Sequence, residues 1–251
     1  MDQINKAAYA RADVVGEYVG ADGLFETERV LLARLAPALR GKPLLDVGVG
    51  AGRTTRHLLE ISDDYTGIDY TPALVEAARR KFPRARLLCR DARDLSPFAD
   101  ESFDFALFSF NGIDYVPHEE RLQVLREVRR VLKPGGYFMF SSHNRECEHF
   151  NKMPWQTKPR LSAPYVKYCL YCLAHLPKHL RMRRHEVHAD EYAVVNDNAH
   201  GFSLLAYYIS APAQLEQLRR AGFSSAEAYD MDGHPTARDT RHPWVYYLAR
   251  K

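Results

Sequence analysis

The chain has 251 residues, of which 46% are hydrophobic and 27% are charged. These values are ordinary for a globular protein and exclude wholesale disorder, and the length suits one α/β domain with room for a sizeable insertion. The formal net charge of +3 is mild, so it gives no general attraction to nucleic acid.

Three observations bear on where the protein works. Residues 1–6 lack the basic and apolar regions of a signal peptide. No apolar run reaches the roughly 18 residues of a membrane-spanning helix. Four cysteines in a chain of this length do not suggest a disulfide framework. We therefore expect a cytoplasmic protein.

The first well-defined element is helical. Residues 25–39 place Val30, Leu31, Leu35 and Leu39 at helical spacing with charged residues between them, which predicts an amphipathic helix. An apolar strand then follows at residues 44–47.

This strand breaks into a loop with the glycine spacing G-x-G-x-G, at Gly48, Gly50 and Gly52. Such a loop, followed by a helix, forms the ligand-binding corner of an open α/β sheet, where backbone amides face the crevice. A nicotinamide-dinucleotide site would have G-x-G-x-x-G, with its last glycine where Arg53 stands. A nicotinamide-dependent oxidoreductase is therefore disfavoured.

Three aspartates stand at successive strand ends. Asp46 precedes the glycine loop, where its carboxylate would repel a pyrophosphate but suits a cationic amino-acid ligand. Asp69 lies 21 residues after Gly48, about the separation at which an acid reaches ribose hydroxyls. Asp91 follows the third strand. One such aspartate is often a turn cap, but three beside a glycine loop indicate a binding site.

The rest of the chain continues the alternation of strands and helices. The run from Phe103 to Phe110 is almost entirely apolar, as expected of a strand buried on both faces. The alternation predicts an α/β protein with a doubly wound sheet. The expected elements, in chain order, are a helix at 53–60, strands at 65–69, 86–89 and 103–110, a helix at 118–132, a strand at 137–142, a helix at 212–221, and strands at 224–231 and 244–249.

The glycine corner resembles the first motif of the class I (Rossmann-like) S-adenosylmethionine (SAM)-dependent methyltransferases. The segment Lys133-Pro134-Gly135-Gly136 resembles the corner before the fifth strand of that family. The resemblance is strong over residues 24–143 and extends by pattern to 212–250. It implies a doubly wound, seven-stranded, mostly parallel sheet with an antiparallel edge hairpin and a helical insertion after the fifth strand.

In domain terms, the resemblance implies that residues 1–251 form a single methyltransferase domain. Residues 1–40 would be an N-terminal helical cap. Residues 144–211 would be a variable, substrate-binding insertion.

The resemblance also implies SAM as the cofactor. In the family, amides at the start of the helix after the glycine loop hold the carboxylate. An acid at the position of Asp69 takes the ribose, and one at the position of Asp91 meets the adenine amino group. Segments similar to the one carrying Tyr9 and Tyr18 close over the cofactor. The expected cofactor-binding residues are Asp46, Gly48, Gly50, Gly52, Asp69, Tyr70, Asp91, Ala92, Phe110 and Asn111.

The insertion is basic. Residues 145–188 contain nine Lys or Arg against three Glu, a net charge of +6. This charge favours an acidic acceptor over an anionic membrane surface, which is a second interpretation that we do not favour. The apolar stretch 165–176 is interrupted only by Lys167 and His175, and we expect it to pack on the core.

Small-molecule methyl transfer is the leading interpretation, with an O or N acceptor. Base-amino methylases carry D/N-P-P-Y/F/W after the fourth strand, where this chain has Asn111-Gly112-Ile113-Asp114. The cytosine-C5 type needs a nucleophilic cysteine near that strand end, and there is none, so we expect no DNA partner. The alternatives are an RNA or other polyanion methyltransferase, or a non-catalytic protein of the same fold that binds lipid or polyanion. The oligomeric state stays open.

Candidate catalytic residues are His143, His200 and Asp114. His143 follows the fifth strand at the crevice rim, and His200 lies in a Gly-bounded loop before a possible strand at 202–210. Either imidazole would suit proton removal from an acceptor. Cys169 and Cys172 form C-x-x-C, but no second paired element accompanies them, so we predict no metal site.

Overall fold

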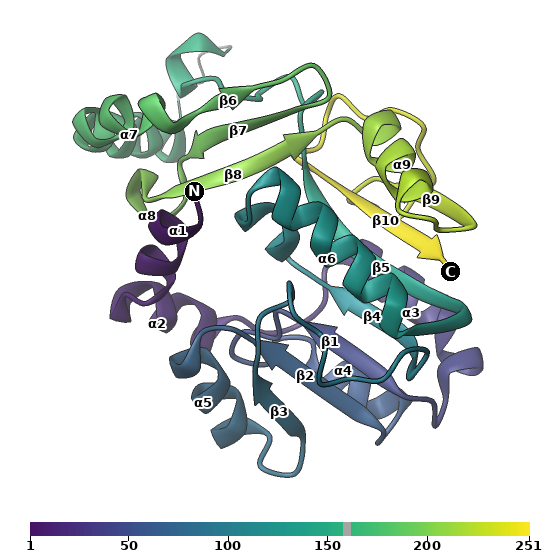
Figure 1. The fold of residues 1–251 in the computed structure, drawn as a ribbon. Helices are drawn as coiled ribbons and strands as arrows, with labels where there is room; N and C mark the ends of the chain where they lie inside the picture. The colour runs from purple at the N-terminus through teal and green to yellow at the C-terminus, as the bar shows by residue number, and fades with distance from the viewer. Residues whose placement is uncertain (158–161) are drawn as a thin grey trace.

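The computed structural model describes residues 1–157 and 162–251. Within them, the strands form one sheet of ten, flanked by helices (Figure 1). The strands are β1 (Leu44–Val47), β2 (Tyr65–Asp69), β3 (Arg86–Cys89), β4 (Phe103–Phe108), β5 (Leu132–Asn144), β6 (Val187–His188), β7 (Tyr192–Asp197), β8 (Leu204–Ile209), β9 (Ser225–Tyr229) and β10 (Trp244–Arg250). The helices are α1 (Asp2–Tyr9), α2 (Ala12–Gly20), α3 (Glu26–Leu39), α4 (Thr55–Ile61), α5 (Pro72–Lys81), α6 (His118–Val131), α7 (Ala163–Met182), α8 (Ala199–Phe202) and α9 (Ala211–Arg220).

Seven of these strands make the expected methyltransferase-like sheet. β3, β2, β1, β4 and β5 lie side by side in that order and run parallel. β10 pairs antiparallel with β5 on one side and with β9 on the other. The predicted seven-stranded, mostly parallel sheet with an antiparallel hairpin at its edge is therefore confirmed, with β9 as the edge strand.

The two faces of the sheet are covered by different helices, as Figure 1 shows. Adjacent residues of a strand point to opposite faces, so Leu44 packs with α3, α4 and α5 in one core. Its neighbour Leu45 packs with α6 and α9 in the other. The doubly wound arrangement is thus confirmed.

The insertion contains more than the expected helix. β8 continues the sheet beyond the end of β5, with His143 opposite Tyr208 in parallel register. β7 pairs antiparallel with β8, and β6 with β7. The possible strand at 202–210 is present as β8. The expected helical insertion contains α7, but it also contains β6 and β7, which the sequence did not predict and which extend the sheet with β8.

The expectation that the 165–176 stretch packs on the core was wrong. Over the whole of α7 the buried residues are Cys172 and His179. Leu170 is 61% exposed and Leu173 is 52% exposed. The reason is that α7 packs mainly against α8 and the turn Pro154–Gln156, and its His179 meets Asn196 of β7 in the outer part of the sheet. Apolar composition alone does not tell which elements a helix will meet.

The helical cap is shorter than expected. α3 belongs to the layer on the main sheet, whereas α1 and α2 form a separate cover that runs from β8 to α5 (Figure 1). The buried side chain of Asn5 fixes α1 to β8: its amide group donates to the Leu205 carbonyl at 2.9 Å and its oxygen accepts from the Leu205 N–H at 3.0 Å.

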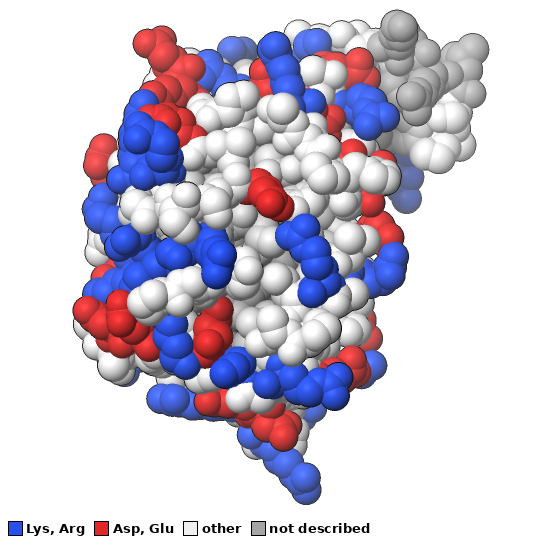
Figure 2. Space-filling view, turned by 90° about the vertical axis from the view of Figure 1, so that its right-hand side faces the viewer, with Lys and Arg blue, Asp and Glu red and all other residues white. Residues whose placement is uncertain are grey.

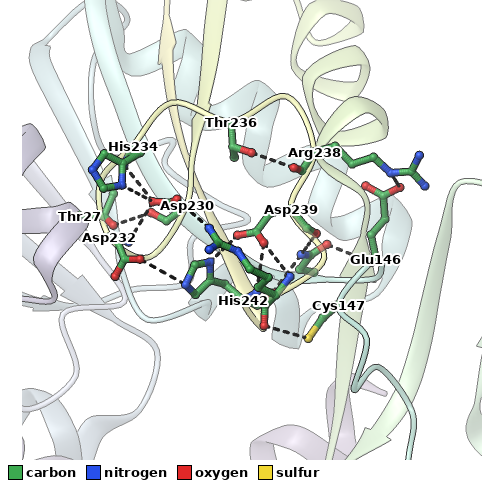
Figure 3. Close-up of polar contacts among 12 residues, drawn as sticks. Thr27, Glu146, Cys147, Asp230, Asp232, His234, Thr236, Arg238, Asp239 and His242 are labelled. Carbon is green, nitrogen blue, oxygen red and sulfur yellow. Dashed lines mark hydrogen bonds and ion pairs between the residues drawn. The ribbon is translucent and has the colours of Figure 1, made fainter.

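The turn between β9 and β10 contacts the first residues of the insertion and fixes their position (Figure 3). The amide of Asn144 donates to the carbonyls of Asp239, at 2.6 Å, and His242, at 3.0 Å. Asp239 in turn accepts from His242 Nδ1 at 2.6 Å. These contacts fix the chain immediately after His143.

The same turn brings Asp230, Asp232 and His234 within 4.8 Å of one another (Figure 3). The Asp230 carboxylate accepts the backbone N–H groups of Asp232, at 3.0 Å, and His234, at 2.9 Å. The clustering therefore follows from closure of the turn.

Charges on the face that carries α9 and the C-terminus are mixed. Figure 2 shows Lys and Arg interspersed with Asp and Glu over this face. On α9, for example, Glu216 pairs with both Arg219 and Arg220. In the described part of the chain, no helix has the length and apolarity to cross a bilayer.

A buried ion pair joins α3 to the glycine loop. The Glu28 carboxylate has no exposed side-chain surface and accepts from both terminal nitrogens of Arg53 at 2.8 Å. It also accepts from the Ser109 hydroxyl and from the Phe25 N–H at 3.0 Å. Removing one partner would leave a nearly buried guanidinium without its counter-charge.

We therefore expect Glu28→Ala to lower the free energy of unfolding by about 3–5 kcal/mol, as measured by urea denaturation. Glu26→Ala is the matched control, because Glu26 lies on the same helix in an exposed pair with Arg29. That control should change stability by no more than about 1 kcal/mol. Equal effects of the two variants would contradict the role given to Glu28.

Candidate functional site

The glycine loop between β1 and α4 opens its backbone to a pocket. Gly48, Gly50 and Gly52 all have positive φ angles, of 66°, 55° and 90°. A Cβ atom at Gly48 would lie 2.5 Å from the Phe108 ring, whereas at Gly50 the nearest atom, on Tyr18, is 4.0 Å away. The loop is therefore packed at Gly48 but leaves free space above Gly50, where a ligand can approach the backbone.

Asp69, at the end of β2, faces this space. It is 8% exposed and lines the pocket. Its two oxygens accept from the N–H groups of Gly50, at 3.0 Å, and Thr71, at 2.8 Å. Burial raises the pKa of the Asp69 carboxyl, and the two backbone N–H groups oppose that rise. The carboxylate keeps further lone pairs for a ligand hydroxyl.

Asp46 does not reach the pocket, contrary to its expected role as a direct ligand contact. It lies behind the loop, where it accepts from the Thr54 hydroxyl at 2.6 Å and the Tyr65 hydroxyl at 2.9 Å. Burial raises the pKa of Asp46 to about 6, against the effect of these two hydrogen bonds. Asp46 thus holds the glycine loop in place through its hydrogen bonds to Thr54 and Tyr65 and does not contact the ligand space.

The remaining expected cofactor residues do not all line the pocket. Gly48, Gly50, Asp69, Tyr70, Ala92 and Phe110 line the pocket, whereas Asn111, expected with them, does not. Gly52 packs against Phe82, which a Cβ there would meet at 2.7 Å.

Asp91 turns to Arg93, whose Nε donates to it at 2.8 Å. Partial burial raises the pKa of Asp91, but the bonds from Arg93 outweigh that effect and lower it overall. An adenine contact through Asp91 would require this pair to open.

Tyrosines of the α1–α2 cover lie across the pocket. The Tyr9 ring stands 5.8 Å from that of Tyr18, 6.4 Å from Tyr70 and 5.5 Å from Tyr115, between centroids. The enclosed space has a volume of about 100 Å³. The expected closure of Tyr9 and Tyr18 over the pocket matches their position.

A second, larger cavity of about 1620 Å³ adjoins the first. Tyr18, Ala21, Phe110 and Tyr115 line both spaces. The insertion supplies much of the larger cavity's wall, including aromatic side chains. The aromatic residues that line the larger cavity but not the glycine-loop pocket are Phe150, Trp155, Tyr165, Tyr168, Phe202, Tyr208 and Trp244.

His143 and Asp114, both named as candidates from the sequence, meet at the wall of this cavity. Asp114 is fully buried, and its Oδ2 lies 2.8 Å from His143 Nδ1 and accepts the His143 backbone N–H at 2.6 Å. His143 Nε2 lies 3.4 Å from the Asn111 amide nitrogen. This pattern fits the tautomer in which Nδ1 donates to Asp114 and Nε2 is an acceptor.

Two charged residues beside this pair were missed from the sequence. Arg121 is fully buried and contacts Asp114 Oδ1, to which Ser142 also donates at 2.7 Å. Arg121 could have been found, because it stands at helical spacing with Val124, Leu125 and Val128 on the buried face of α6. Asp197 ends β7, and its Oδ2 lies 3.6 Å from His143 Nε2; only the pairing of the insertion's strands brings it there.

His200 also lines the larger cavity, but on the side of the α1–α2 cover. Its Nδ1 lies 2.9 Å from Glu17 Oε2, and its φ of 49° marks a kink in α8. The two candidate histidines therefore belong to different walls of one cavity.

Comparison with known proteins adds to this geometry. The family described as "Methyltransferase domain" matches residues 45–140. A demethylmenaquinone methyltransferase from Clavibacter sepedonicus is 30% identical over 230 residues, covering 88% of this chain and 80% of the relative. The chain belongs to the class I SAM-dependent methyltransferases.

One further relative is similar over less of its length, and one solved structure shares the fold. A malonyl-[acyl-carrier protein] O-methyltransferase from Halorhodospira halophila is 34% identical over 131 residues, which cover 50% of this chain but only 43% of the relative. The structure of 1,6-didemethyltoxoflavin-N1-methyltransferase from Burkholderia thailandensis, with that acceptor and S-adenosylhomocysteine bound, has a TM-score of 0.61 at 17% identity. It covers 99% of this chain and 88% of the other.

The pocket at the glycine loop fits the family's cofactor, SAM, in its chemistry. Free space lies above Gly50, a carboxylate faces it at Asp69, and Tyr70 and Phe110 supply apolar walls. The pocket's volume of about 100 Å³ is small for a molecule of that size, but the pocket adjoins the larger cavity across Tyr18, Phe110 and Tyr115.

Asp69→Ala should remove a hydrogen bond to the charged carboxylate worth about 1.5–3 kcal/mol. We therefore expect SAM affinity, measured by calorimetric titration, to fall at least about tenfold. Gly50→Val should lower it more, because the side chain would fill the free space and a branched residue is strained at this φ. Asp63→Ala, at an exposed position before the other end of β2, is the control. Unchanged affinity in a folded Asp69→Ala variant would refute the assignment.

Proposed function

We propose that this methyltransferase transfers the methyl group of SAM to an oxygen or nitrogen atom of a small molecule held in the larger cavity, with His143 as the general base. One observation carries the proposal. His143 Nδ1 is engaged by Asp114 at 2.8 Å while the ring lines a cavity that shares a wall with the glycine-loop pocket.

The paired histidine suits proton removal. Because Asp114 accepts from Nδ1, the lone pair of Nε2 faces the acceptor side, and a hydroxyl or ammonium proton of the acceptor can move to it. The imidazolium formed would lie between two carboxylates, Asp114 at Nδ1 and Asp197 at 3.6 Å from Nε2. Both would stabilise its charge at low local dielectric.

Arg121 acts behind this pair as a positioning residue. Its guanidinium contacts Asp114 and also donates to the Ile113 carbonyl at 3.0 Å and to Gln214 Oε1 at 2.6 Å. It therefore compensates the buried carboxylate charge and fixes its orientation. Removing it would misplace His143 without touching the acceptor.

Bound SAM supplies an electrophilic methyl group on a sulfonium, which transfers by in-line displacement. Gly50, Asp69 and Tyr70 would hold its amino-acid and ribose parts, and Ala92 would border the adenine. Phe110 and Tyr115, which line both spaces, would separate the reacting centre from the acceptor's body. Much of the rate enhancement would come from this alignment.

The cavity favours a bulky acceptor with ring or chain surface. Its volume of about 1620 Å³ exceeds the range of about 300–1,000 Å³ that is common for small-molecule sites. Aromatic side chains from the insertion line it. The relatives are named for malonyl-[acyl-carrier protein], demethylmenaquinone and 1,6-didemethyltoxoflavin, so family membership leaves the acceptor open.

An acidic acceptor has narrower support than the sequence suggested. Of the seven basic residues in 145–188 that the structure describes, Lys152 and Arg183 line the cavity and the other five do not, and Glu17, Glu148 and Asp197 line it as well. Lys158 and Arg160 lie outside the described residues. Any attraction of an anion into the cavity would therefore depend on Lys152, Arg183 and the lining histidines.

His143→Ala should lower kcat by about 10²–10⁴-fold while leaving SAM affinity unchanged, because only proton removal is lost. An acceptor is first identified in a screen by the mass of one added methyl group. Turnover is then followed as S-adenosylhomocysteine release. A chelator should have no effect on this rate.

His200→Ala is the matched comparison on the opposite wall. Loss of turnover in His200→Ala alone would move the base to that residue. Near-full turnover in both variants would refute a histidine base and leave catalysis to alignment.

If the acceptor is anionic, its KM should rise with salt while SAM affinity changes little. Lys152→Gln with Arg183→Gln should raise that KM by about threefold to tenfold, since two favourable charges are removed from the cavity. Arg56→Gln with Arg126→Gln, at exposed positions on α4 and α6, makes the same charge change elsewhere. Salt-independent KM values would contradict an anionic acceptor.

A further inference from the structure

One face of α7 is apolar and exposed. Val166 is 50% exposed, and Leu170, Leu173 and Leu180 are each more than half exposed. At about 100° per residue these four side chains fall within an arc of about 80°, so they form one stripe along the helix. The opposite side of the helix, with Cys172 and His179, is buried.

Basic residues flank and follow this stripe. Lys167 and Arg181 stand beside it on the helix, and Arg184 follows its end; all three are exposed. From Ser162 to His185 the sequence contains no Asp or Glu. We call the exposed apolar stripe and these three basic residues the α7 surface.

We propose that the α7 surface docks the protein on an anionic lipid bilayer, with the helix lying along the membrane plane. A basic amphipathic helix of this kind buries its apolar stripe at the boundary of headgroups and acyl chains, while its Lys and Arg meet anionic headgroups. One partner thus covers the apolar stripe and supplies counter-charge to the cations.

Charge distinguishes this partner from a second copy of the chain. In a symmetric dimer through α7, the same patch would face itself. The cations of one copy would then meet those of the other with no acid on either helix. An anionic surface instead supplies the missing counter-charge.

Docking in this way brings the larger cavity to the membrane. Tyr165, Tyr168 and Leu176 of α7 line that cavity, and Leu180 belongs both to its lining and to the exposed stripe. The helix is therefore a shared wall between the cavity and the bilayer. If the proposed function holds, an acceptor dissolved in the membrane would have a short path to His143.

Binding of the full chain to vesicles tests the proposal without reference to methyl transfer. The protein should co-sediment with phosphatidylcholine vesicles that contain phosphatidylglycerol, and much less with vesicles of phosphatidylcholine alone. Raising the salt concentration should release it, because the interaction with headgroups is screened.

Two variants probe the two parts of the surface. Leu170→Glu with Leu173→Glu should reduce vesicle binding at least about tenfold, since the stripe can no longer enter the bilayer. Arg181→Glu with Arg184→Glu should also reduce it at least about tenfold. Arg56→Glu with Arg126→Glu is the control for net charge, made at exposed positions on α4 and α6, and should bind as the natural chain does. SAM titration confirms that each variant is folded.

Three results would overturn the proposal. The first is no co-sedimentation with the anionic vesicles at low salt. The second is binding by both surface variants equal to that of the natural chain. The third is a dimer in light scattering that Leu170→Glu with Leu173→Glu converts to a monomer, which would assign the face to self-association. None of these results depends on whether His143 is the base.

Discussion

The site depends on the contacts that the buried carboxylate of Asp114 makes with His143 and Arg121. Asp114 lies after β4, accepts from His143 at the end of β5, and contacts Arg121 from α6. Three elements of the main sheet and its helical layer are thereby fixed at one point. A charge so deeply buried is tolerable only because a guanidinium, a hydroxyl and an N–H satisfy it together. The orientation of His143 follows from this arrangement.

The insertion completes what the main sheet begins. β8 continues from the end of β5, and β7 carries Asp197 to the free side of His143. The turn between β9 and β10 fixes the next residue, Asn144, through the carbonyls of Asp239 and His242. The catalytic candidate therefore lies where the main sheet meets the strands of the insertion.

The basic residues of the insertion fall into two groups. Lys152 and Arg183 line the cavity, whereas Lys167, Arg181 and Arg184 do not. A single count of charges over 145–188 combines groups that face different partners. Their separation into a cavity set and an outer set is a property of how α7 lies over the cavity, with one face inward and one outward.

The sequence by itself determined the seven-stranded sheet and the glycine corner, and it placed Asp69 and His143 at the ends of strands. It could do so because parallel strands end at one edge, so residues at strand ends gather there whatever the packing elsewhere. Tertiary structure decided the rest. Asp46 lies behind its loop and Asp91 turns to Arg93, because side-chain direction at a strand end depends on neighbouring groups. The burial of Arg121, the approach of Asp197 and the exposure of α7 all depend on contacts between distant segments, which no local pattern contains.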